Sequence, residues 1–325
     1  FKGAWLSYIF YLNKSKVYGI SDKILPGDSF FKALKLKDKI NSYYIDLNNY
    51  DLLKKKINEI KPDIIFHLAA QPIVKEGLKN PTRTFLSNSI GTMNILEAVR
   101  TGFKPQAMVM ITSDKAYRNN EWEWGYRESD ELGGDDPYSA SKASAELAIN
   151  SYVKSFFVKK KNIKLAVARA GNVIGGGDWS ENRVVPDCIR AWSTSKIFKV
   201  RNPNSTRPWQ HVLEALSGYL ILAIQLKKND KINGEAFNFG PKSNVEKKVS
   251  KLIKEMKLNI GRIKIIKKKN NKFYESQLLK LNSKKAKNLL NWRCILNFRE
   301  TIKMTALWYK NFYERRVESL QFSKN

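Results

Sequence analysis

The sequence contains little cysteine and no long apolar segment. Cys188 and Cys294 are the only cysteines among 325 residues, and they lie far apart with no pairing pattern. This predicts reduced, cytoplasmic conditions and argues against a zinc site, so no metal is expected. No apolar run approaches the roughly 18 residues that span a bilayer. The apolar N-terminus lacks a basic leader and a small-residue cleavage site, which argues against a signal peptide. We therefore expect a soluble protein with no membrane partner.

Acidic residues are also scarce, since 30 Asp and Glu stand against 59 Lys and Arg, for a net charge of +29. Such an excess invites a nucleic-acid hypothesis. However, residues 226–325 hold 26 basic and 8 acidic residues, so +18 of the +29 lies there, mostly on lysines scattered over predicted helix surfaces. The one dense cluster, residues 263–273, is expected to be a solvated loop, with a polyanion site as the alternative. We predict no nucleic-acid partner.

Apolar strand-like runs alternate with amphipathic helical segments in the first half of the chain. Continuous Val, Ile, Leu and Met strands separated by helices indicate a parallel sheet covered on both faces. The fold class predicted is therefore α/β, with a doubly wound parallel Rossmann-type sheet. The expected strands are 16–20, 63–70, 107–113 and 163–170, and the expected helices are 50–60, 82–101 and 138–158.

The regular alternation of strands and helices ends after residue 172, which indicates a smaller mixed α/β substrate-binding domain. Residues 175–179 are expected to form a loop. We predict a dinucleotide-binding domain from 1–170 plus roughly 205–240, and a discontinuous substrate-binding domain from roughly 171–204 and 241–325. The expected helices are 183–195, 211–226, 245–256 and 298–313, and the expected short strands are 197–200, 236–239 and 263–266.

Polar residues follow three of the predicted strands at the point where each strand ends. Residues 69–71, 113–115 and 169–172 occupy these positions. Ligands of open parallel sheets bind beyond the carboxyl ends of the strands. The three clusters therefore predict one shared site.

Tyr138 and Lys142 lie four residues apart in a predicted helix that begins near Pro137, which suits a first helical turn. Free tyrosine has a pKa near 10, and a neighbouring ammonium or a cationic nicotinamide ring favours the phenolate. The pair therefore lets tyrosine exchange a proton near neutrality. A Tyr packed on a lysine stem is the structural alternative, but Ser113 supplies a second hydroxyl at a strand end.

A Tyr-x-x-x-Lys motif with an upstream Ser resembles the short-chain dehydrogenase/reductase family. Residues 66–72 and 88–100 resemble its extended, sugar-nucleotide branch. Residues 112–128, 169–179 and 202–220 resemble the CDP-glucose 4,6-dehydratases of that branch in particular. The resemblance implies a tightly held NAD, CDP-glucose as substrate, a homodimer formed through the helices at 82–101 and 138–158, and a role in deoxysugar synthesis for surface polysaccharide.

The resemblance covers residues 1 to about 313, including the stretch 276–292. In that family a Thr-Gly-x-x-Gly turn precedes Phe-Lys-Gly, and here only Phe1, Lys2 and Gly3 of this region stand in the sequence. We therefore expect the first strand to be missing and Gly3 to be the last glycine of the turn. The acid that reads the ribose is not obvious, since residues 17–23 offer only Asp22.

The resemblance implies oxidation at C4, loss of water across C5 and C6, and return of hydride to C6. Tyr138 would take the C4 hydroxyl proton while Ser113 holds the oxygen. Asp114 would be the acid for the departing hydroxyl, with a pKa raised by burial. Lys115 would be a neutral base at C5, or it would stabilise the enolate. A strand-end salt bridge between Asp114 and Lys115 is the structural alternative.

The resemblance also assigns binding residues. Lys142 would anchor the nicotinamide ribose and lower the tyrosine pKa. Asn88 would support the site, with a helix cap as its alternative, and Trp122 and Trp124 are expected to pack rather than to wall the sugar pocket. His211 would touch the nucleotide or be a packed structural histidine. The remaining cofactor-binding residues would be Gly3, Asp46, Leu68, Ala69, Ala70 and Gln71, and the remaining substrate-binding residues Asn172, Arg183 and Arg207.

Three alternatives to a dehydratase stay open. A sugar-nucleotide epimerase would not need Asp114 and Lys115. A non-catalytic homologue would follow from a missing first strand, and a nucleic-acid binder would follow from lysines gathered with 263–273 on one face.

Overall fold

The computed structural model describes residues 1–24, 26–157, 163–241, 247–267 and 278–315. Its central sheet has four parallel strands in the order β10-β5-β4-β3. A separate parallel pair joins β1 to β2 and is not hydrogen-bonded to β3 among the described residues. The predicted parallel α/β architecture is confirmed. The strands are β1 (Tyr18–Ser21), β2 (Asn41–Tyr44), β3 (Ile64–His67), β4 (Ala107–Ile111), β5 (Leu165–Ala170) and β10 (Ala236–Phe239).

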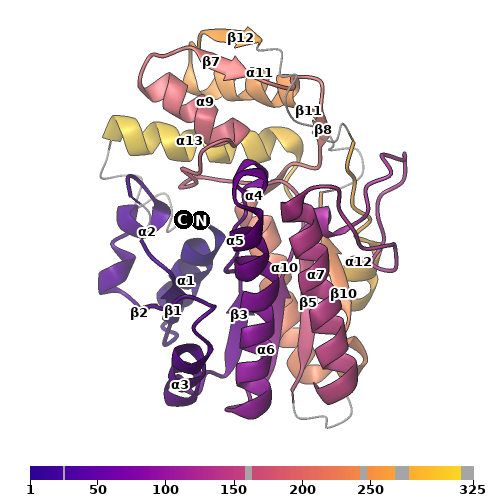
Figure 1. Cartoon of the computed structure of the whole chain (residues 1–325). Coiled ribbons are helices and arrows are strands. Elements are labelled where there is room, and N and C mark those ends of the chain that lie inside the picture. Colours follow the sequence, from indigo (N-terminus) through magenta and orange to yellow (C-terminus); the bar gives the residue numbers. More distant parts are fainter. Residues whose placement is uncertain (25, 158–162, 242–246, 268–277, 316–325) are drawn as a thin grey trace.

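Helices cover both faces of this sheet, as Figure 1 shows. Along the fully buried β4, side chains alternate between two apolar cores, because successive residues of a strand point to opposite faces. Val109 joins the core that contains α1 (Lys2–Leu12) and α10 (Val212–Lys228). Met108 joins the core that contains α3 (Tyr50–Ile60), α6 (Gly91–Thr101) and α7 (Pro137–Tyr152).

The helix predicted over 82–101 is interrupted by one π-helical turn. It consists of α5 (Pro81–Phe85), the π-helical η2 (Leu86–Ile90) and α6. A π turn holds one more residue than an α turn and changes the direction of the side chains that follow, often at a functional site. Asn88 lies in this turn and is buried.

The second half of the chain adds a layer beyond one end of the sheet (Figure 1). Within it β7 pairs with β12, and α11 packs on α13. One apolar core runs from β4 and β5 into this layer, so the predicted domain boundary stays a prediction. The layer contains α9 (Val184–Ser193), β7 (Phe198–Val200), β8 (Thr206–Arg207), β11 (Lys247–Lys248), α11 (Val249–Ile260), β12 (Ile265–Lys267) and α13 (Phe298–Arg315).

Short elements complete the described chain. They are α2 (Phe30–Ala33), η1 (Leu36–Asp38), α4 (Val74–Lys79), η3 (Asp114–Ala116), η4 (Val153–Phe157), β6 (Val173–Ile174), β9 (Gln210–His211), η5 (Asp230–Ile232) and α12 (Lys284–Leu290). None of the helices in the described ranges has the length and apolar character needed to cross a bilayer.

Candidate active site

Ser113 and Asp114 lie directly beyond the end of β4 and are both buried. Ser113 caps the short helix η3, since its Oγ accepts a hydrogen bond from the backbone N–H of Lys115 over 3.2 Å. The same hydroxyl donates to Asp114 Oδ1 over 2.9 Å. Asp114 Oδ2 is buried and has no hydrogen-bond partner among the described residues. This arrangement leaves one carboxylate oxygen available to a ligand.

Tyr138 and Lys142 lie on successive turns of α7 and are buried. Asp136 caps this helix, with Oδ1 accepting from the backbone N–H groups of Tyr138 and Ser139 over 2.9 and 3.1 Å. Burial raises the pKa of the Tyr138 phenol, while its hydrogen bond with Ser113 and the charge of Arg183 lower it. The influences that lower the Tyr138 pKa therefore come from Ser113 and Arg183 rather than from Lys142.

Burial also sets the protonation of the charged groups beside Tyr138. It raises the pKa of Asp114, against the effects of Lys115, the Ser113 hydroxyl and Arg207. The direction of this shift is the one expected for Asp114. Burial lowers the pKa of Lys142 to about 8, and Glu146 opposes this change. The site thus combines a buried acid with a buried amine that titrates near neutrality.

The alternative of a salt bridge between Asp114 and Lys115 is wrong, because no ion pair joins them in the described parts of the chain. Lys115 is half-buried and donates its backbone N–H to Ser113. Its ammonium acts on Asp114 only through its charge.

The loop after β3 is tied to α7 through Asn88. Asn88 Oδ1 accepts from the Gln71 backbone N–H over 2.7 Å, and Nδ2 donates to the Gln71 carbonyl over 3.1 Å. Nδ2 also lies 2.9 Å from the Ser141 hydroxyl, one residue before Lys142. The helix-cap alternative for Asn88 is therefore wrong. This residue holds the 68–71 loop beside the helix that carries Tyr138 and Lys142.

The other predicted cofactor residues lie at several element ends. Gly3 lies inside the first turn of α1 rather than in a preceding turn, with nothing within 4 Å of the position a Cβ would take. Asp46 is exposed beyond β2, where its Oδ1 accepts from the backbone and side-chain nitrogens of Asn48, each over 2.9 Å. Leu68, Ala69 and Ala70 follow β3 and are partly buried.

The predicted substrate residues approach the same site from the second half of the chain. Arg207 on β8 is buried and its charge acts on Asp114. Arg183 acts on Tyr138 and pairs with the buried Asp178 over 3.1 Å. Asn172 follows β5, and its carbonyl accepts from the Gln210 N–H over 3.2 Å.

His211 has the features of a packed structural histidine. It is buried at the start of α10, where its Nδ1 accepts from the Leu213 N–H over 3.4 Å. Burial lowers its pKa to about 4, so the ring is neutral at pH 7.

The sequence analysis missed Lys2 and Asp178. The Lys2 ammonium lies 3.4 Å from the Tyr219 hydroxyl and interacts with Lys142, Arg183 and Asp114. Burial, followed by the charge of Lys142, lowers its pKa to about 7. Asp178 forms an ion pair with Arg183. The spacing of the two residues in the sequence does not predict this pair. Lys2 precedes Gly3, which the family resemblance assigns to the cofactor turn. This neighbouring position in the sequence could have indicated that Lys2 lies near the site.

Trp122 and Trp124 differ from each other. Trp122 packs on Tyr126 with ring centroids 5.4 Å apart, as expected. Trp124 is 71 % exposed, so the expectation that it packs is wrong. Most of the basic cluster 263–273 lies outside the described residues. Cys188 and Cys294 are both buried and form no disulfide with each other.

Comparisons with known proteins agree with this fold and identify the family of the chain. The family model described as GDP-mannose 4,6 dehydratase matches residues 1–305. A CDP-glucose 4,6-dehydratase from Salmonella typhimurium strain LT2 is 39 % identical over 319 residues, which is 95 % of this chain and 88 % of the relative. A UDP-glucose 4-epimerase from Mycoplasma genitalium is 27 % identical over 302 residues, 87 % of this chain and 85 % of the relative.

Solved structures share the architecture at lower identity. A dTDP-glucose 4,6-dehydratase from Streptomyces venezuelae, solved with NAD and TYD bound, has a TM-score of 0.82 at 17 % identity and covers 95 % of this chain and 94 % of its own. A UDP-glucose 4-epimerase from Thermotoga maritima, solved with UDP-glucose, has a TM-score of 0.81 at 20 % identity and covers 97 % of both chains. From the match over residues 1–305 and the relative at 39 % identity, this chain belongs to the GDP-mannose 4,6-dehydratase family.

Proposed function

We propose that the protein is an NAD-dependent lyase that converts CDP-glucose to CDP-4-keto-6-deoxyglucose, a step of deoxysugar synthesis. The relative at 39 % identity supports both the reaction and the nucleotide. The observation that carries the proposal is Asp114, which is buried beside Ser113 with Oδ2 unpartnered among the described residues. Elimination of water needs an acid at this place, whereas epimerisation does not.

The residues around Lys142 suit NAD. Its buried ammonium has no recorded hydrogen bond or ion pair within the described chain, which leaves it available to a ribose hydroxyl. Nothing lies within 4 Å of the position that a Cβ would take at Gly3, which allows close approach of a ligand to this residue. Small Ala69 and Ala70 allow close approach of a ligand to the loop that Asn88 holds. Gln71, Leu68 and Asp46 complete the proposed NAD-binding set.

Bound NAD would accept a hydride from C4 of the sugar and return it to C6. Tyr138 takes the proton of the C4 hydroxyl, and Ser113 hydrogen-bonds to the same oxygen. Because burial raises the Tyr138 pKa, the phenolate needs positive charge nearby, which Arg183 and the cationic ring supply. Lys142 would hold the ribose of bound NAD.

The new ketone at C4 acidifies the proton on C5. Asp114, kept protonated by burial, gives its proton to the departing C6 hydroxyl. Lys115 removes the C5 proton or stabilises the resulting enolate, and both roles remain open. The diphosphate is held by Arg207, Arg183 and Asn172, since the guanidinium fork suits phosphate oxygens. His211 orders the start of α10 next to them.

The test is an assay of the purified protein with NAD and CDP-, dTDP-, UDP- and GDP-glucose. We expect a 4-keto-6-deoxy product from CDP-glucose, released with no net NADH. A product from another nucleotide alone would contradict the substrate assignment. Conversion to a C4 epimer without dehydration would favour the epimerase alternative, and a protein that takes up no NAD would favour the non-catalytic one.

We also propose that two copies associate through α5, η2 and α7. Phe85, Leu86, Ile90 and Leu147 are between 37 % and 59 % exposed on these elements, and such apolar area favours association. Sedimentation of the wild type and of a Leu86→Glu/Leu147→Glu variant tests this. The scarcity of cysteine, with only Cys188 and Cys294 in 325 residues and no pairing pattern, supports a cytoplasmic location.

A further inference from the structure

A buried ion pair lies one helical turn beyond Lys142. Arg169 on β5 and Glu146 on α7 are each 3 % exposed. Arg169 Nε lies 2.9 and 2.8 Å from Glu146 Oε1 and Oε2, and a terminal nitrogen of the same guanidinium also contacts Oε2. The carboxylate is therefore bound along the edge of the guanidinium, a geometry that fixes both side chains.

The pair joins three elements that carry the proposed active-site residues. Thr112, which precedes Ser113 at the end of β4, donates its hydroxyl to Glu146 Oε1 over 2.5 Å. Glu146 follows Lys142 by four residues on α7, and Arg169 precedes Asn172 by three at the end of β5. One carboxylate thus connects the strand end with the serine, the helix with the tyrosine and lysine, and the strand end with the substrate residue.

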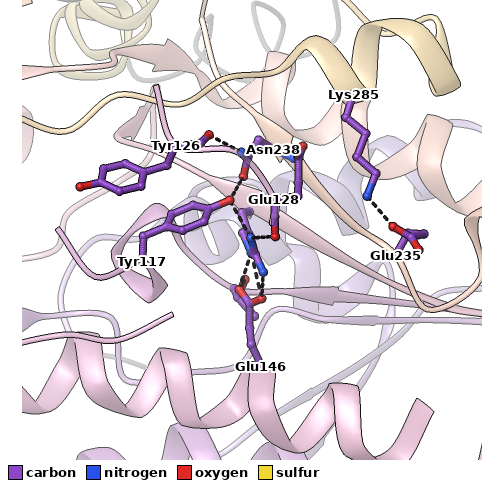
Figure 2. Close-up of polar contacts among 9 residues, drawn as sticks. Tyr117, Tyr126, Glu128, Glu146, Glu235, Asn238 and Lys285 are labelled. Carbon is purple, nitrogen blue, oxygen red and sulfur yellow. Dashed lines mark hydrogen bonds and ion pairs between the residues drawn. The ribbon is translucent and has the colours of Figure 1, made fainter. Parts of the chain in front are cut away.

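The network continues from Arg169 into the long loop between β4 and α7. Arg169 donates to the Tyr117 hydroxyl over 2.6 Å and to the Glu128 carbonyl over 3.2 Å. Tyr117 in turn donates to Asn238 Oδ1 on β10 over 2.8 Å. Figure 2 shows the side chains of Tyr117, Glu146 and Asn238 directed toward one common point.

Asn238 links the same network to the loop and to the chain near α12. Its N–H donates to Glu128 Oε1 over 2.7 Å, and its Nδ2 donates to the carbonyls of Tyr126 over 2.8 Å and Asn282 over 3.2 Å. In contrast, Glu235 and Lys285 form a pair to one side of this group in Figure 2, with side chains 47 % and 25 % exposed. The Glu146–Arg169 pair is buried, whereas the Glu235–Lys285 pair is partly exposed. Variants of the two pairs can therefore be compared within one region.

A buried ion pair is a costly way to gain stability, because both charges are removed from water, and apolar side chains of similar volume often replace it without loss. Here every oxygen and most of the guanidinium are used to hold elements that carry the reacting groups. Three charged or titratable groups interact with Lys142, namely Glu146 on the same helix, Lys2 on α1 and His67 on β3. Glu146 is the anion among them.

We propose that Glu146 and Arg169 are positioning residues for the reaction: their ion pair fixes Tyr138 and Lys142 on α7 against Ser113 and Asp114 beyond β4. This inference rests on the proposed dehydratase function. It concerns residues that touch neither the sugar nor the cofactor. It predicts an effect on turnover and on its pH dependence that a purely structural pair would not have.

The experiment compares the full chain as wild type, Glu146→Gln, Arg169→Met, and Lys285→Met as the surface control. For each we would measure kcat and KM for CDP-glucose from pH 6 to 10, NAD retained after gel filtration, and the urea unfolding midpoint. Glu146→Gln keeps the shape and removes the charge, and it replaces one of the two oxygens that accept from Arg169 by an NH2 donor. Since Glu146 raises the Lys142 pKa, its loss should move the basic limb of kcat to lower pH.

Arg169→Met should lower kcat by about 10²-fold with a smaller change in KM, because misplacement of reacting groups by about 1 Å has this effect. Without its cation the buried Glu146 carboxyl is favoured in its neutral form, so the basic limb of this variant should also move to lower pH. Lys285→Met should match the wild type in kcat, KM and NAD retention, since it leaves the buried pair intact. A basic limb unchanged in Glu146→Gln, or a kcat of Arg169→Met that falls only in proportion to the folded fraction, would overturn the inference. Absence of dehydratase activity in the wild type would instead refute the proposed function. NAD retention would then still show whether the variants disturb the position of Lys142 on α7.

Discussion

Ser113 donates its hydroxyl to Asp114 Oδ1 over 2.9 Å and so leaves Oδ2 as a buried, unpartnered oxygen among the described residues. Burial raises the pKa of this carboxyl, against the effects of Lys115, the Ser113 hydroxyl and Arg207. The proposed function gives the two adjacent residues different roles. In it Ser113 would hold the oxygen that is oxidised, and Asp114 would give a proton to the hydroxyl that departs.

The first prediction concerns Asp114→Asn. Asparagine fills the same space but cannot give a proton, so dehydration should fall by about 10²–10⁴-fold, the range of a general acid. Oxidation at C4 should persist, and NADH should accumulate on CDP-glucose. Product analysis together with absorbance of NADH measures both. Full activity of this variant on a sugar nucleotide would favour an epimerase.

Gly171 offers a second test of the same oxygen. A Cβ at this position would lie 3.2 Å from Asp114 Oδ2 and 3.0 Å from Pro208 Cγ. Gly171→Ala should therefore displace the carboxyl and lower kcat by on the order of tenfold. Gly19→Ala is the matched control, since its Cβ would meet only Ile40 at an ordinary 3.4 Å. Equal kinetics of the two variants would show that Asp114 tolerates the displacement.

The third prediction concerns Tyr138→Phe, which removes the phenol while keeping the ring. Without a group to take the C4 hydroxyl proton, hydride transfer should slow by about 10²–10⁴-fold. Single-turnover formation of NADH on CDP-glucose reports this step. Tyr50→Phe is the control, because the Tyr50 hydroxyl bonds Thr101 on the exposed side of α3 and α6. A normal NADH burst in Tyr138→Phe would remove the tyrosine from the mechanism.

Hydrophobic periodicity is sufficient to predict most of the fold. The amphipathic pattern predicts a helix at residues 50–60, where α3 buries Leu53 and Ile57, while its cap Asn49 is known from the structure. Strand β10 was predicted at 236–239 for its apolar run. Strand β2 was not predicted, because its two ends, Asn41 and Tyr44, are exposed and its sequence lacks a buried run.

The site was only partly accessible from the sequence. The residue types and spacing of Tyr138, Lys142 and Ser113 predict a proton-exchanging site, whereas the role expected of Asp114 comes from the family resemblance. The π turn that carries Asn88 was missed, because one extra residue hardly changes a helical pattern. The partnership of Glu146 with Arg169 was missed as well, since it depends on how α7 packs against β5.

The last prediction concerns acid stability. Burial lowers the pKa of His67 from 6.5 to about 3, and that of His211 from 6.5 to about 4. Between these values and pH 6.5 the unfolded chain binds protons that the folded chain does not, so the free energy of unfolding falls as the pH falls below 6.5. Each histidine contributes a slope of about 1.4 kcal/mol per pH unit within its window.

Urea unfolding of the wild type at pH 7.5, 5.5 and 4.5 measures this slope. His67→Asn keeps a polar group near Thr92, whose hydroxyl lies 3.0 Å from the His67 Nε2, but does not titrate in this range. It should be less stable at pH 7.5, yet lose less stability on acidification than the wild type does. His211→Asn tests the second ring in the same way. An unchanged pH slope in both variants would show that acid unfolding arises from the carboxyl groups and not from the buried imidazoles.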